Sequence, residues 1–298
     1  NITSSIEVSN DKAIVALFEE MHYADIAEIL DELSFDNVVY IIKLLDSEKT
    51  SAVLMELDED IREKTLQNLS AKEIAEEVEE LDSDDAADII GELSQERQEA
   101  VLSKIEDEEH VKEIEELLAY DEDSAGGLMA KELVKVNENW TVLKCVREMR
   151  AQAEEVTRVH SIYVVDDNDK LKGRLSLKDL LITSTKTAIS EVYIPKVDFV
   201  NVHDNLDEVS NKMRKYDLEA IPVIDNNGVL LGRITIDDIV DVIKEGADKD
   251  YQLAAGLTQD VEADDSILQL TKARLPWLFL GLLGGVGAFL IMVMCENT

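Results

Sequence analysis

Aliphatic residues recur every twelve positions through the first 120 residues of the chain. One column consists of Leu33, Leu45, Leu57, Leu69, Leu81, Leu93, Ile105 and Leu117, and a second of Leu30, Ile42, Leu54, Leu66, Val78, Ile90, Leu102 and Ile114. Columns three residues apart lie on one helix face. The residues directly after the first column are mostly types that cap helix N-termini: Ser34, Asp46, Asp58, Ser70, Asp82, Ser94 and Glu106. Because such short helices are marginal alone in water, the pattern predicts an α-solenoid of stacked helices.

A second pattern runs from Gly127 to about Gly246, where short aliphatic strands alternate with helices and the segment repeats itself. Residues 162–181 align with 221–240 at an offset of 59, and 133–149 match 199–215 at an offset of 66. The first copy is therefore expected to carry seven extra residues near 151–160. The strands are joined by DDND in one copy and DNNG in the other, which are good hairpin turns. This part is predicted to be a duplicated βαββα unit.

The last feature is an apolar run of 21 residues, 275–295, that contains no charge. About 20 such residues suffice for a helix to cross a bilayer. Lys272 and Arg274 precede the run and Glu296 follows it. By the positive-inside tendency, this predicts a cell-membrane protein with residues 1–274 in the cytoplasm.

The composition of the chain, above all its net charge, limits the classes of function that it can have. The chain has 66 acidic and 29 basic residues and a net charge of -37, which argues against a nucleic-acid partner. Self-repulsion at this charge favours bound cations, although an acidic surface that only serves solubility is the alternative. Cys145 and Cys295 offer no disulfide or zinc framework. With four histidines and no catalytic motif, the chain is predicted not to be an enzyme.

Carboxylates gather in the segment SDDAAD at 83–88. On a helix, Asp84 and Asp88 lie one turn apart, with Asp85 beside them and Asp82 at the cap, and like charges at this spacing repel by a few tenths of a kcal/mol. Two explanations stay open. Favourable placement against the helix dipole accounts for Asp82 to Asp85 better than for Asp88; a cation site accounts for all of them.

Both βαββα copies end in a shared motif, which reads Gly173-Arg174-Leu175-Ser176-Leu177-Lys178-Asp179 and Gly232-Arg233-Ile234-Thr235-Ile236-Asp237-Asp238. The motif resembles that of the CBS (cystathionine-β-synthase) domain. This resemblance implies that Ser176, Lys178 and Asp179 face a nucleotide such as ATP. The alternative is a helix cap, with the hydroxyl over an Asp in the first turn.

The order of the parts resembles the MgtE family of magnesium transporters and channels, most closely at YDEDSAGGLM, residues 120–129. The resemblance divides the chain into an N-terminal tail (1–14), an all-α superhelical solenoid (15–126), two α+β CBS domains (127–190 and 191–246), a connecting or plug helix (247–274) and a transmembrane helix (275–295). It further implies a homodimer, anchored in the lipid bilayer, that closes its pore when Mg²⁺ bridges the cytosolic domains. A membrane-tethered adenine-nucleotide sensor is the competing hypothesis.

Metal ligands also follow from the resemblance, residue by residue. Mg²⁺ prefers oxygen ligands and often takes one or two carboxylates. The family's ligand positions fall on Asp84, Asp88, Gly127, Asp217, Asp238, Asp241 and Asp250. Three positions that can be acidic in the family are Ala52, Asn205 and Lys249 here, and Leu218 and Ser161 stand where aromatic residues can be found near adenine.

Overall fold

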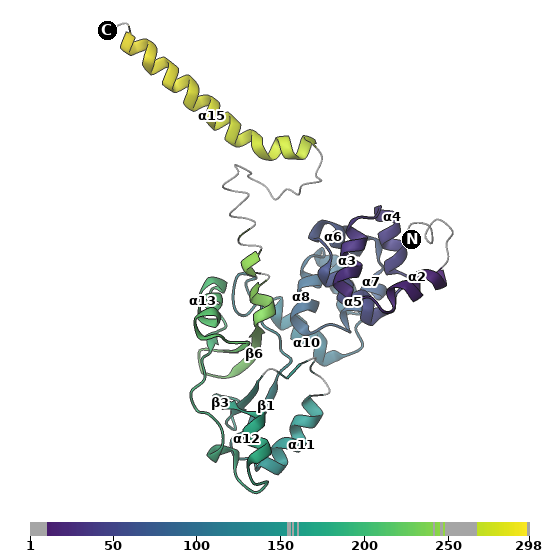
Figure 1. The fold of residues 1–298 in the computed structure, drawn as a ribbon, viewed down its shortest axis with the longest axis vertical. Coiled ribbons are helices and arrows are strands. Elements are labelled where there is room, and N and C mark those ends of the chain that lie inside the picture. Colours follow the sequence, from purple (N-terminus) through teal and green to yellow (C-terminus); the bar gives the residue numbers. More distant parts are fainter. Residues whose placement is uncertain are drawn as a thin grey trace. The chain divides into compact units, whose positions relative to one another are not determined.

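The computed structural model describes residues 11–153, 156, 158–159, 161–240, 242–244, 247 and 267–296 (Figure 1). The chain divides into two compact units, residues 1–235 and 236–298. The first contains a helical array followed by two small three-stranded sheets. The second contains the long helix α15.

The helical array has a repeat of twelve residues. Its helices are α2 (Asp11–Phe18), α3 (Tyr23–Asp31), α4 (Phe35–Ile42), α5 (Ser47–Glu56), α6 (Glu59–Asn68), α7 (Ala71–Val78), α8 (Ser83–Gly91), α9 (Gln95–Leu102) and α10 (Glu108–Leu117). From α3 to α9, each helix begins twelve residues after the one before it, and α10 begins thirteen after α9. Helices two apart pack together, as α3 does with α5, α5 with α7, and α8 with α10. The predicted solenoid is confirmed.

The second aliphatic column forms the solenoid core. Its members are at most 2% exposed, except Leu102, which is half-buried. The predicted N-cap positions are confirmed from Ser34 to Ser94, and the side chains of Asp46 and Ser70 accept the capping hydrogen bond, but Glu106 is not a cap. Asp107 caps α10 instead, and its carboxylate accepts bonds from the backbone N–H groups of Glu109 and His110 at 2.8 and 3.3 Å. The extra residue before α10 leaves the Glu106 amide to donate to the Glu79 carboxylate.

The two sheets have the same topology. The first copy contains β1 (Val134–Asn137), α11 (Val142–Gln152), β2 (Ile162–Val165), β3 (Leu171–Leu175), α12 (Leu177–Ile182) and a 3-10 turn, η1 (Ile189–Glu191). The second contains β4 (Val200–Asn201), α13 (Leu206–Tyr216), β5 (Ala220–Ile224) and β6 (Leu230–Thr235). In each sheet the central strand pairs in parallel with the first strand and antiparallel with the third. The predicted duplication is confirmed.

The hairpin register reproduces the offset of 59. Val164 lies opposite Gly173, and Val223 lies opposite Gly232, each followed by an irregularity in the ladder. The turns also correspond, because Asp169 and Gly228 both have positive φ, 55° and 85°.

The upstream offset of 66 is wrong. Val136 pairs with Val164, and Val200 pairs with Val223, so the first strands correspond at an offset of 64. Helices α11 and α13 also begin 64 residues apart. The first copy therefore carries five extra residues, rather than seven. Side chains in a strand alternate with a period of two, so a shift of two preserves the aliphatic pattern and the sequence alone did not reveal the error.

The second compact unit is helical where the structure describes it. Residues 236–240 are helical, and α15 (Ile267–Glu296) is a helix of 30 residues that covers the predicted apolar run. Its side chains at Leu275, Trp277 and Phe279 are more than half exposed. Among the described residues, none of the helices meets the combined length and hydropathy expected of a membrane span. The predicted span at 275–295 stays a prediction, and most of the predicted connecting helix lies outside the described residues.

Candidate metal centre

The segment that leaves the solenoid is bound to the second CBS copy, not to the first. The Gly126 N–H donates to the carbonyl oxygen of Val202 at 2.9 Å, and Ala130 and Arg233 exchange two backbone hydrogen bonds of 2.8 and 2.9 Å. Residues 126–130 thus lie along β6 and the loop after β4. The solenoid is fastened to the second copy through its own linker.

The close approach of this linker explains the glycine of the motif. A Cβ atom on Gly232 would lie 2.5 Å from the carbonyl oxygen of Ala130, and one on Gly173 would collide with the carbonyl oxygen of Ile194. Only glycine lets backbones approach this closely. In each copy the glycine therefore makes room for a neighbouring chain segment.

A buried arginine joins the second copy to the solenoid. Arg233 is only 6% exposed. Its Nε donates to the Glu132 carbonyl oxygen at 2.6 Å, and its Nη2 lies 3.3 Å from Oδ2 of Asp82. Asp82 is the N-cap of α8, but its side chain makes no capping hydrogen bond. The carboxylate instead pairs with Arg233, which links α8 to β6.

A second bridge runs from the linker to the same helix start. The backbone N–H and the hydroxyl of Ser83 donate to the two carboxylate oxygens of Glu132, each at 2.9 Å. The Ser83 hydroxyl also accepts from the Lys131 N–H at 2.9 Å. Ser83 is fully buried, so these bonds hold the Glu132 carboxylate in place over the first turn of α8.

Three carboxylates meet at this junction. Asp82, Asp84 and Glu132 each place an oxygen within 4.8 Å of the others, and all three side chains are half-buried. An oxygen-only set of this kind matches the ligand preference of Mg²⁺. Two of the groups come from the solenoid and one from the linker, so a bound cation would hold these segments together.

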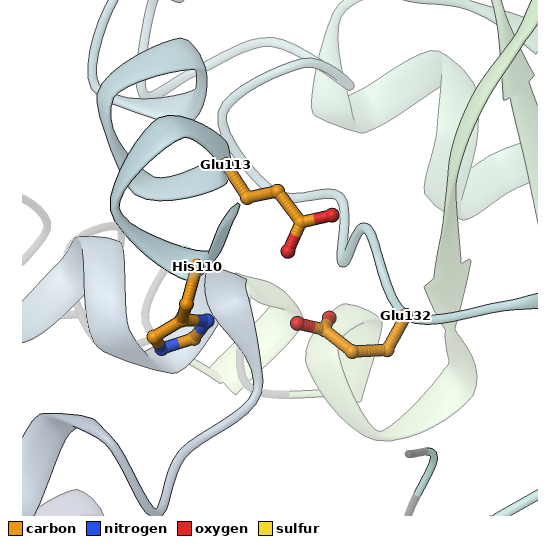
Figure 2. Close-up of side chains that lie close together, drawn as sticks. All are labelled: His110, Glu113 and Glu132. Carbon is orange, nitrogen blue, oxygen red and sulfur yellow. The ribbon is translucent and has the colours of Figure 1, made fainter. Parts of the chain in front are cut away.

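A second group shares Glu132. His110 and Glu113, one turn apart on α10, and Glu132 place ligand atoms within 4.8 Å of one another. Figure 2 shows the carboxylates of Glu113 and Glu132 turned toward each other, with the imidazole beside them. Burial, followed by the nearby negative charge of Glu132, raises the pKa of Glu113 to about 7. Lys131 acts in the opposite direction, toward a lower pKa.

The predicted metal ligands are only partly brought together. Asp84 belongs to the three-carboxylate group. Asp88 is exposed one turn further along α8, Gly127 is half-buried in the linker, and exposed Asp217 ends α13 with a left-handed backbone. Neither group found among the described residues includes these three. Asp238 is half-buried in the second compact unit, while Asp241 and Asp250 lie outside the described residues.

The predicted nucleotide residues lie at the start of α12. Ser176 occupies the N-cap position, but its hydroxyl makes no capping hydrogen bond. Asp179 is half-buried in the first turn, and Lys178 is exposed. In the first copy Ser176 therefore stands at the predicted N-cap position, but its hydroxyl does not make the hydrogen bond that the capping explanation expects.

Four residues of the junction escaped sequence analysis: His110, Glu113, Glu132 and Arg233. The spacing of His110 and Glu113 shows that they share a helix face, but nothing local pairs them with Glu132. Arg233 stands in the CBS motif, yet Arg174 occupies the same place in the first copy and is exposed. The motif therefore contained no signal that distinguishes the two arginines.

Known proteins resemble both parts of the chain. The family model for the MgtE intracellular N domain matches residues 21–123, and the CBS-domain model matches 125–184 and 189–245. The magnesium transporter MgtE of Thermus thermophilus is 38% identical over 169 residues, or 56% of this chain and 38% of that protein. The Enterococcus faecalis MgtE is 36% identical over 169 residues, or 55% and 37%. The chain therefore spans less than two fifths of the length of these relatives.

Two solved structures share the fold over most of the chain. The crystal structure of the cytosolic domain of the Mg²⁺ channel MgtE in complex with ATP has a TM-score of 0.75 and 33% identity, and covers 81% of this chain and 98% of that one. The soluble part of a magnesium transporter has a TM-score of 0.71 and 27% identity, and covers 83% and 96%. These relatives are named as transporters or channels, in agreement with the prediction that the chain is not an enzyme. The chain belongs to the MgtE family, of which it carries the intracellular N domain and the CBS pair.

Proposed function

We propose that this chain is the Mg²⁺-sensing and gating portion of a magnesium transporter or channel. The observation that carries the proposal is the meeting of Asp82 and Asp84 with Glu132, three carboxylates within 4.8 Å at the place where the linker meets the solenoid. Arg233 pairs with Asp82 at this junction. Three carboxylates gathered in this way offer the oxygen ligands that Mg²⁺ prefers.

In the proposed mechanism, cytosolic Mg²⁺ bridges the solenoid, the CBS pair and the connecting helix at 247–274, and this closed arrangement shuts the pore. When Mg²⁺ falls, the carboxylates repel one another and the domains separate. One ion at tenfold its Kd stabilises the closed state by about 1.4 kcal/mol, and several ions make the response steeper. We assign the further ligands to Asp88, Gly127, Asp217, Asp238, Asp241 and Asp250.

Limited proteolysis across a Mg²⁺ titration tests this function. We expect millimolar Mg²⁺ to protect the region near 119–130, and we expect Asp84→Asn with Asp88→Asn to raise the midpoint. Glu59→Gln with Asp60→Asn removes the same charge from exposed positions on α6 and is the matched control. Equal protection by NaCl at matched ionic strength would show that Mg²⁺ acts by screening alone; Ca²⁺ tests ion selectivity.

A nucleotide is the second proposed ligand. The supporting observations are the ATP complex of a relative that is 33% identical to this chain and the Ser176 hydroxyl that makes no capping bond. We propose that Ser176, Lys178 and Asp179 contact the nucleotide. Calorimetric titration with ATP should show binding that Asp179→Ala weakens. Nucleotide protection without any Mg²⁺ response would instead favour the adenine-nucleotide sensor as the main function.

The chain is also proposed to act as a homodimer through its CBS pair. Helix α12 exposes Leu177, Leu181 and Ile182 by 58%, 80% and 74%. A two-fold axis is the commonest way to bury one face against its own copy. Light scattering should give a dimer mass for the chain and a smaller mass for Leu181→Glu. A wild-type monomer at tens of micromolar protein would contradict the proposal.

Finally, we propose that residues 275–295 cross the cell membrane and leave residues 1–274 in the cytoplasm. The support is the uncharged run of 21 residues together with the exposed apolar side chains of α15. The chain should stay in the membrane fraction after alkaline extraction. Release into the soluble fraction, as expected for a variant that lacks 275–298, would contradict this assignment.

A further inference from the structure

A histidine distinguishes the second cluster at the junction from the first. His110 lies beside the carboxylates of Glu113 and Glu132 (Figure 2), and the three ligand atoms are within 4.8 Å of one another. Imidazole nitrogen suits Zn²⁺ and its first-row neighbours, whereas Mg²⁺ is bound by oxygen. We propose that His110, Glu113 and Glu132 form a binding site for a transition-metal ion of the Zn²⁺ type.

The imidazole is oriented for this role by its other nitrogen. Nε2 of His110 lies 3.3 Å from the carbonyl oxygen of Val78. As an N–H it donates to that carbonyl, which leaves Nδ1 with the lone pair for a metal. Histidine ligands in metal sites almost always have such a partner on the second nitrogen, because it fixes the tautomer and the ring direction.

Glu132 is held in place in a comparable way. Its two carboxylate oxygens each accept a 2.9 Å bond from Ser83, and a carboxylate oxygen that accepts one bond still has a second lone-pair site. The buried Ser83 therefore orients this ligand without using up its capacity. Glu113 completes the set from the helix turn that follows His110.

The three ligand atoms must move slightly closer together to bind one metal ion. In a tetrahedral zinc site with bonds of about 2.0 to 2.2 Å, the ligand atoms are about 3.3 to 3.5 Å apart. The ligand atoms here lie within 4.8 Å of one another, so metal binding requires the side chains to move closer by at most about 1.5 Å. Three protein ligands then leave the fourth position to water, and the bound ion fastens α10 to the segment before β1.

Binding of Zn²⁺ to the full, metal-free chain tests the proposal. We expect calorimetry to show one tight site per chain, and we expect His110→Gln and Glu113→Gln each to weaken it at least about tenfold. Glu115→Gln removes an exposed carboxylate from the same helix and should bind Zn²⁺ like the wild type. A tenfold excess of Mg²⁺ should leave Zn²⁺ in place.

The outcomes separate this site from the proposed Mg²⁺ response. If His110→Gln and Glu113→Gln bind Zn²⁺ as tightly as Glu115→Gln, the site is elsewhere and the proposal is overturned; absence of a tight site in the wild type overturns it too. His110→Gln should keep the wild-type Mg²⁺ midpoint in proteolysis, because no oxygen ligand is removed. Two single variants are used so that the test still holds if one of them fails to fold. Thermal unfolding shows whether each variant is folded.

Discussion

Arg174 and Arg233 occupy the same position in the two CBS copies but have different surroundings. Both exchange a pair of backbone hydrogen bonds with the segment that leads into the other copy, Arg174 with Ile194 and Arg233 with Ala130. Arg174 is exposed, whereas Arg233 is buried against Asp82. The duplicated sequence therefore determines the local pairing, and the solenoid determines which arginine becomes part of a junction.

The two pairings also cross over between the copies. The segment before the first copy, at Ala130, pairs with the second copy, and the segment before the second copy, at Ile194, pairs with the first. As a result, the solenoid linker is bonded to β6, and β6 continues in sequence directly into Asp238. Through these hydrogen bonds, the second copy connects the solenoid linker to the strand that leads into the C-terminal part of the chain.

The largest effect should come from Arg233→Ala. The substitution removes a buried charge partner of Asp82, and a fully buried pair loses about 3 to 5 kcal/mol on such a change. Because Asp82 is 26% exposed, we expect a loss of about 2 kcal/mol in the free energy of unfolding by urea. Arg174→Ala is the matched control and should change it by less than about 0.5 kcal/mol. Equal losses would contradict the difference between the copies.

Gly126→Ala should have the next largest effect, because it acts on the linker itself. A Cβ at this position would lie 2.7 Å from the Tyr120 ring and 2.7 Å from Cγ2 of Val202. Overpacking of this kind typically costs about 1 to 3 kcal/mol. The corresponding position before the second copy is the exposed Ser190, so Ser190→Ala should be nearly neutral. Thermal unfolding together with cleavage near 119–130 measures both.

Repetition explains how much of the fold the sequence revealed. The twelve-residue period correctly predicted the seven helices from α3 to α9, and the offset of 59 correctly predicted the hairpins of the CBS pair. The predictions that proved wrong concern places where periodicity carries no information. A two-residue shift of β4 preserves strand alternation, and one inserted residue moved the α10 cap from Glu106 to Asp107.

The site was less accessible to sequence analysis than the fold. Asp82 and Asp84 were recognised because they stand together on one helix start. Glu132 is 49 residues from Ser83, and Arg233 is 151 residues from Asp82, so their contacts depend on how the linker lies along β6. A single sequence holds no local pattern for contacts of that kind.

The stabilities of the solenoid and of the CBS hairpins should depend on pH in opposite directions. Burial, followed by the negative charges of Glu76, Asp46 and Glu80, raises the pKa of Glu77 to about 8. The folded state therefore holds a proton that the unfolded chain releases above its value of 4.5. Stability from this group is complete below pH 4.5 and is lost as pH rises toward 8.

Glu77→Gln removes that pH dependence. At pH 9 we expect the free energy of unfolding of the variant to exceed that of the wild type by about 1 kcal/mol, a value that allows for the solvent that reaches this half-buried group. At pH 5 we expect a much smaller difference. Glu80→Gln, at an exposed position on the same segment, should show no comparable change between the two pH values. A constant difference for Glu77→Gln from pH 5 to 9 would refute the raised pKa.

The smallest effect, and the one that should be equal in both copies, concerns Asp166 and Asp225 in the hairpin turns. The backbone N–H of Asn168 lowers the pKa of Asp166, and the side-chain amide of Asn227 lowers that of Asp225. Both groups therefore stabilise the fold above pH 3.8, the unfolded value, and lose this contribution as pH falls through the lower folded pKa. Asp166→Asn and Asp225→Asn should each lower Tm slightly and by the same amount at pH 7, with the difference from wild type shrinking below pH 3.8. A clearly larger loss for Asp225→Asn would mean that the influence of the solenoid on the second copy reaches beyond Arg233 and the linker.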